Sequence, residues 1–152
     1  MKKIRVTVDR IIEWALILLL SIMVINVLWQ VFTRFFTASP SSFTDELARY
    51  LMIWLGILGA AYVAGKEEHV AIDFFAKKLD ASKQRLISNF IILSIISFAF
   101  FGMVVGGSRL VYITAKLEQF SPSLKIPLAF VYAVIPLSGL LILFYKLTKN
   151  KT

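Results

Sequence analysis

The chain has 152 residues, 59% of them hydrophobic, and a mean hydropathy of +0.79. Soluble domains are about 45–50% apolar, and a domain of this length buries only about two-thirds of its surface, so a soluble fold would leave much apolar surface in water. The net charge is +8, but the cations lie at the ends of apolar runs and not on one continuous face, which argues against nucleic-acid binding. The absence of Cys excludes disulfides and thiolate metal sites, and the single His excludes bis-His haem ligation within the chain.

Four long apolar runs follow one another, at 14–36, 47–65, 86–108 and 128–145. Each is close to the roughly 20 residues that cross about 30 Å of hydrocarbon, and lipid forces such runs to be helices. We therefore predict an all-α integral membrane protein, a single domain over 1–152, with spans at about 12–36, 43–65, 84–110 and 127–147. The first run is too long for the apolar part of a signal peptide, about 7–15 residues, and is expected to be a retained span.

The distribution of Lys and Arg predicts the orientation. Four of them precede the first span, five lie at 66–85 and three follow the last span, against five on the other side. The positive-inside rule then places both termini in the cytoplasm, in a four-helix bundle.

The connections differ in character. Ser42 and Asp45 form an S-x-x-D helix start, which places the beginning of the second span near Phe43. In the cytoplasmic connection at 66–85, apolar residues recur with helical spacing from Ile72 to Leu79, which predicts an amphipathic helix at the membrane surface. The alternative is a solvated linker with chance periodicity.

The outer connection at 113–127 contains two prolines, one of them Pro127, which favour extended backbone. It is the largest outer feature and the expected outer contact surface. Pro136, inside the last span, removes a backbone hydrogen bond and is expected to bend that helix.

Polar residues recur every four positions near the outer end of the first span, at Asn26, Gln30 and Arg34. Glu46 and Arg49 in the second span lie at a similar depth, and polar groups inside a membrane usually face protein or water. We predict a polar cluster of Gln30, Arg34, Glu46 and Arg49 with an Arg34–Glu46 ion pair. Alternatively, the two arginines extend separately to lipid headgroups.

Small residues mark possible packing faces. Gly102 and Gly106 form a G-x-x-x-G pattern in the third span, which permits close approach of another helix. The pattern leaves two alternatives open, ordinary packing within the chain and an interface with a partner.

The sequence offers little that could couple transport to an ion. No acidic residue lies in the middle third of any span, and Glu13 lies at the edge of the first. His69 is interpreted as structural, with a proton relay or ligand role as the alternative. Without nucleotide-binding, nucleophile or metal-ligand motifs, we expect neither an enzyme nor a self-sufficient transporter.

The second span, the connection that follows it and the outer connection before the last span resemble a known family. Residues 43–54 read FTDELARYLMIW, followed by Lys66, His69 and Asp73, and by SPSLKIP at 121–127. This pattern resembles the DctQ-like small permease subunit of tripartite ATP-independent periplasmic (TRAP) transporters, and the resemblance covers essentially the whole chain. Its family-pattern positions, interpreted as structural or interface residues, are Glu46, Arg49, Tyr50, Trp54, His69 and Asp73.

The resemblance implies a role that composition does not. A small subunit of this kind would pair one-to-one with a large permease subunit that carries substrate and sodium, in a bacterial or archaeal cytoplasmic membrane. A periplasmic binding protein would deliver an organic acid such as a dicarboxylate or sialic acid. The chain itself would be non-catalytic and hold no cofactor, its partners being these two proteins and membrane lipids.

Two other functions fit four short spans. A small multidrug-type exporter, acting as a homodimer, relies on a glutamate embedded in its first span, whereas Glu13 lies at the edge. An anchor of a redox complex would need haem ligands that the chain lacks.

Overall fold

The computed structural model describes residues 2–37, 42–66 and 81–149. In these residues helices form the four spans, with a single isolated bridge in an outer loop. The helices, in chain order, are α1 (Lys2–Thr37), α2 (Ser42–Lys66), α4 (Ala81–Ser97), η1 (Phe98–Gly106), α5 (Gly107–Lys116), α6 (Leu128–Tyr132) and α7 (Val134–Lys149). Four stretches of them are long and apolar enough to cross a membrane. The predicted all-α fold with four spans is confirmed.

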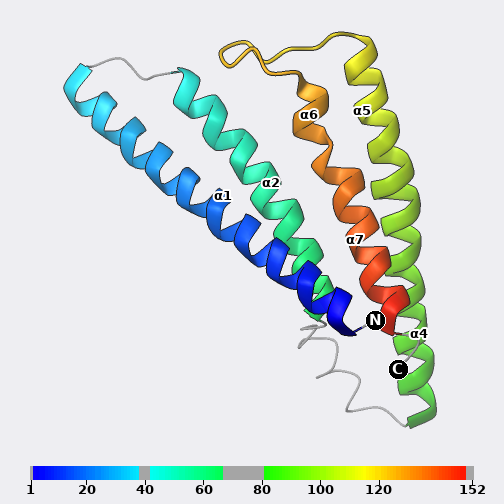
Figure 1. The fold of residues 1–152 in the computed structure, drawn as a ribbon. Coiled ribbons are helices and arrows are strands. Elements are labelled where there is room, and N and C mark those ends of the chain that lie inside the picture. The colour runs from blue at the N-terminus through cyan, green and yellow to red at the C-terminus, as the bar shows by residue number, and fades with distance from the viewer. Residues whose placement is uncertain (1, 38–41, 67–80, 150–152) are drawn as a thin grey trace.

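Helix α1 is longer than the predicted first span. It begins at Lys2, has 36 residues and is therefore about 54 Å long, well beyond the roughly 30 Å of hydrocarbon. No Gly or Pro interrupts its first ten residues, so the helix extends past the apolar run. In Figure 1, α1 is strongly inclined relative to α7.

The four spans are arranged as an open row. Helix α1 packs against α2, α2 against α7, and α7 against η1. The row spreads apart toward the end that holds the outer connections, here called the outer end (Figure 1). Both described chain ends lie at the opposite, inner end. An open row leaves apolar side chains exposed on both of its faces.

The core is small and lies where the spans converge. Ile12, Leu58, Val134 and Tyr145 form one buried cluster, and Ala61 with neighbouring residues of η1 and α7 forms another. In the four apolar windows only 11% to 33% of the residues are buried within the chain. Lipid or another protein must cover the remaining apolar surface.

The third span packs through glycines other than the predicted pair. Gly102 and Gly106 lie in the π-helical segment η1 and are exposed. In contrast, a Cβ atom added at Gly107 would lie 2.9 Å from the Ile135 Cγ2 atom, and one at Gly139 would lie 2.8 Å from the Met103 Cβ atom. The close approach of α7 to the third span therefore depends on Gly107 and Gly139.

The fourth span is interrupted at Ala133, between α6 and α7. Pro136 has no N–H to bond the Tyr132 carbonyl, which explains a break one turn before it. The predicted surface helix falls mostly on residues 67–80, outside the described residues, and remains a prediction.

Candidate functional site

Glu46 joins the start of α2 to the outer loop at 117–127. Its Oε2 atom accepts hydrogen bonds from the backbone N–H groups of Ser123, at 2.8 Å, and Leu124, at 3.0 Å. Its Oε1 atom accepts a 2.8 Å bond from the Tyr50 hydroxyl. Charge-assisted bonds of this kind are stronger than neutral ones, so Glu46 holds the loop against α2.

The outer loop is compact and not simply extended. The Ser121 N–H donates to the Ile126 carbonyl at 2.9 Å, and the Lys125 N–H donates to the Ser121 carbonyl at 3.0 Å. Ser121 is only 2% exposed. Lys125 adopts the left-handed conformation, with φ 53°, which turns the chain back toward Pro127, the residue before α6. The two prolines do not extend the whole loop, because these backbone hydrogen bonds fold the residues between them into a compact turn.

The polar stripe of α1 does face α2, but with different partners from those predicted. Asn26 Nδ2 donates to the Thr44 carbonyl at 2.8 Å, and Gln30 Nε2 lies 3.5 Å from Asp45 Oδ1. These contacts set the rotation of α1 about its axis relative to the start of α2.

The predicted Arg34–Glu46 ion pair is not formed. Arg49 pairs instead with Asp45, at 2.7 Å and one helical turn away, while Glu46 binds the loop. Neighbouring residues of a helix point about 100° apart, so Asp45 and Glu46 cannot both face α1. No acidic side chain of the described residues forms an ion pair with Arg34.

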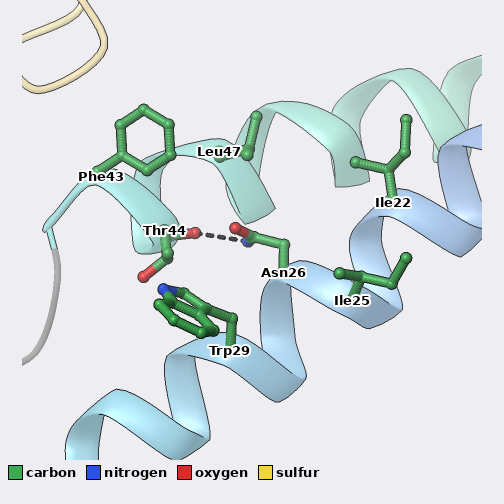
Figure 2. A pocket seen from close by; sticks show the side chains of 7 residues that line it. All are labelled: Ile22, Ile25, Asn26, Trp29, Phe43, Thr44 and Leu47. Atoms are coloured by element: carbon green, nitrogen blue, oxygen red, sulfur yellow. Dashed lines mark hydrogen bonds between the residues drawn. The ribbon is translucent and has the colours of Figure 1, made fainter.

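Two pockets lie on either side of α2 near the outer end. The first, here called the α1–α2 pocket, has a volume of about 360 Å³ and is lined by Ile22, Ile25, Asn26, Trp29, Phe43, Thr44 and Leu47. Figure 2 shows the Trp29 ring beside Thr44, and the Asn26 amide bonded to the Thr44 backbone.

The second pocket, about 240 Å³, is entirely apolar and lies between α2 and α6. The Trp54 and Phe130 rings stack beside it, with centroids 5.5 Å apart. Trp54 therefore packs α2 against the fourth span, and Tyr50 lines the same pocket.

A second polar network lies at the inner end, which the sequence analysis did not predict. Arg5 Nη2 donates to the Gly65 carbonyl at 2.7 Å, satisfying one of the last carbonyls of α2. The Tyr145 hydroxyl donates to Asp9 Oδ1 at 2.6 Å, and the Arg5 guanidinium lies 5.8 Å from the centroid of the Tyr145 ring. This network ties three of the four spans together.

Glu13 belongs to the same end of the row. It accepts hydrogen bonds from the Tyr62 hydroxyl and from Lys66 Nζ, the latter at 3.2 Å. Lys66 also lies over the Tyr62 ring, 4.5 Å from its centroid. The spacing of Arg5, Asp9 and Glu13, four residues apart, was the signal that could have found this network.

The other candidate residues divide by position. His69 and Asp73 lie outside the described residues. Among the residues that the structure does describe, no group of three or more His, Cys, Asp or Glu side chains could hold a metal ion. The networks around Glu46, Asp9 and Glu13 instead join elements of the chain to one another at the two ends of the row.

Comparison with known proteins identifies the family. The DctQ component of tripartite ATP-independent periplasmic transporters matches residues 23–149. The chain belongs to this family. The match begins within the first span and includes the outer loop and, except for Leu19 and Ile22, the residues that line the two pockets.

Individual TRAP transporter proteins are also similar to the chain. The sialic acid TRAP transporter small permease protein SiaQ of Vibrio cholerae is 26% identical over 150 residues, 98% of this chain and 84% of that protein. The C4-dicarboxylate TRAP transporter small permease protein DctQ of Rhodobacter capsulatus is 33% identical over 102 residues, 66% of this chain and 44% of that protein. The sialic acid TRAP transporter permease protein SiaT of Haemophilus influenzae is 31% identical over 62 residues, 41% of this chain but only 10% of that protein.

Proposed function

We propose that the chain is the non-catalytic small permease subunit of a TRAP transporter, and that it braces a large permease subunit in the membrane. The complex would contain one copy of each and reside in a bacterial or archaeal cytoplasmic membrane, with both termini of this chain in the cytoplasm. Membership in the DctQ family supports the assignment to a TRAP transporter. The similarity to 10% of the length of SiaT supports a larger permease chain as the partner.

The open row of helices is the observation that supports the bracing role. A closed bundle would bury its apolar side chains internally, whereas here no more than 33% of any apolar window is buried within the chain. Two wide apolar faces are available to a partner, and van der Waals packing drives association between membrane helices. The hydrogen bonds of Glu46, Arg5 and Asp9 tie the row together at its two ends.

The proposed transport reaction is sodium-coupled uptake of an organic acid. Substrate and sodium would be handled by the large subunit, because the carboxylates of Glu46, Glu13 and Asp9 accept hydrogen bonds within the chain at the ends of the row. The relatives named for C4-dicarboxylate and sialic acid transport support an organic acid as the class of substrate.

Co-purification tests this proposal. The chain, tagged at its C-terminus, is extracted from native membranes in mild detergent. We expect one large polytopic partner in equal amount, and sodium-driven uptake only in proteoliposomes that contain both proteins. A single chain or homodimer that transports alone would contradict the proposal and favour the exporter alternative.

The outer loop is the proposed contact with the substrate-binding protein. Within it, Phe120 is 56% exposed and Lys125 is exposed, and so is Lys116, the last residue of α5 before the loop. A rigid loop presenting an aromatic side chain and cations suits a transient protein contact. Reversing both charges to Glu should lower uptake most at low ionic strength, with the neutral Gln pair intermediate. Uptake that is unchanged at every ionic strength would argue against this contact.

A further inference from the structure

The α1–α2 pocket has the lining of a site for a hydrocarbon chain. Its walls are mainly apolar and include Ile22, Ile25 and the half-exposed rings of Trp29 and Phe43. Its amide, Asn26, is already bonded to the Thr44 carbonyl at 2.8 Å (Figure 2). A polar ligand would therefore gain little here, whereas an acyl chain would bury apolar surface.

A cation without an ion pair among the described residues lies between this pocket and the outer end of α1. Arg34 follows Asn26 and Gln30 at four-residue spacing, and both of those side chains bond to the start of α2. Arg34 is therefore on the same face of α1, closer to the outer end, and it is exposed.

The nearby carboxylates are engaged elsewhere. Asp45 is paired with Arg49 at 2.7 Å, and Glu46 binds the amides of the outer loop. This leaves the guanidinium of Arg34 with its charge unpaired among the described residues. In addition, the start of α2 carries the positive end of a helix dipole, which also favours an anion.

We propose that this pocket binds an anionic phospholipid, with one acyl chain between α1 and α2 and the headgroup phosphate at Arg34. The apolar pocket between α1 and α2 suits an acyl chain. Arg34, which lies closer to the outer end and has no ion pair among the described residues, suits the headgroup phosphate. The proposal requires only that the chain spans a membrane. It can therefore fail while the TRAP assembly stands, and the reverse also holds.

Trp29 provides the reporter, since it lines the pocket. In full-length chain carrying Trp14→Phe and Trp54→Phe, Trp29 is the only tryptophan. The protein is reconstituted in phosphatidylcholine vesicles that contain either acyl-brominated phosphatidylglycerol or acyl-brominated phosphatidylcholine at equal mole fraction. We expect Trp29 quenching to report about a fivefold binding preference for the anionic lipid, the size expected for one arginine near a headgroup.

Two charge variants separate the site from general attraction to headgroups. Arg34→Gln should abolish the preference, whereas Arg109→Gln, which removes an exposed cation near the beginning of α5, should retain it. Equal quenching by the two lipids in the parent protein would overturn the proposal. An equal loss in both charge variants would overturn it as well.

A third variant tests the pocket itself. Ile25→Phe adds volume at an exposed position of the lining, so folding should be preserved. It should lower the preference for the anionic lipid although Arg34 is intact. An unchanged preference would mean that Arg34 alone binds the headgroup, and it would overturn binding of the lipid's acyl chain in the pocket.

Discussion

The ring of Tyr145 lies directly against the backbone of Gly65. A Cβ atom added at position 65 would be 2.6 Å from the Tyr145 Cδ2 atom and 2.8 Å from its Cγ atom. The ring cannot easily withdraw, because its hydroxyl donates to Asp9 at 2.6 Å and the residue is only 3% exposed. This contact joins the end of α2 to α7 at the point where the spans converge.

We predict that Gly65→Ala destabilises the chain by about 1–3 kcal/mol, the usual cost of overpacking a tight contact. The thermal unfolding midpoint of the purified protein in detergent measures it. Gly56→Ala is the matched control in the same helix, because nothing lies within 4 Å of a Cβ atom there. Equal midpoints for the two variants would show that the Tyr145 contact is not tight in the protein.

The four spans could be predicted because apolar run length is a local property of the sequence. The order of the helices in the row could not. In a membrane, an apolar face is satisfied by lipid as well as by protein, so hydrophobicity does not select which helices are neighbours. The glycines illustrate this. Gly102 and Gly106 form the recognisable G-x-x-x-G pattern but are exposed, whereas Gly107, which belongs to no such pattern, makes the contact with α7.

The polar networks were partly predictable. Four-residue spacing correctly placed Asn26 and Gln30 on the face of α1 toward α2. It did not decide between Asp45 and Glu46, because that choice depends on the rotation of α2 about its own axis. The backbone N–H groups that bind Glu46 belong to a loop 77 residues away along the chain, and no sequence pattern indicates that contact.

Glu46→Gln should loosen the outer loop. A neutral amide accepts weaker hydrogen bonds than a carboxylate, and its nitrogen cannot accept any. We expect the Ser123 and Leu124 amides to exchange hydrogen about tenfold faster. Asp45→Asn is the control, because it alters the exposed pair with Arg49 and the 3.5 Å contact with Gln30, but no bond to the outer loop. Unchanged exchange rates in Glu46→Gln would mean that the internal bonds of the loop suffice.

The two kinds of glycine in the third span should respond differently to Ala. Gly107→Ala brings a Cβ atom within 2.9 Å of Ile135 and Pro136, and should lower stability by about 1–3 kcal/mol. Gly106→Ala meets only the Phe101 carbonyl, at 3.4 Å, and should have little effect on the isolated chain. Denaturation in mixed micelles compares the two directly. A larger loss at Gly106 would place the close helix contact on the G-x-x-x-G face instead.

Glu13→Gln should leave uptake by the complete transporter within about twofold of the parent, since partly exposed ion pairs contribute little. Glu13 binds Tyr62 and Lys66 at the inner end of the row, with 46% of its side chain exposed, which suits a structural role and not a coupling site. Uptake of organic acid by proteoliposomes containing both subunits measures it, and co-purification of the large subunit shows that the complex is intact. Abolished uptake in an intact complex would instead make Glu13 a coupling carboxylate, as an embedded glutamate is in a proton-driven exporter.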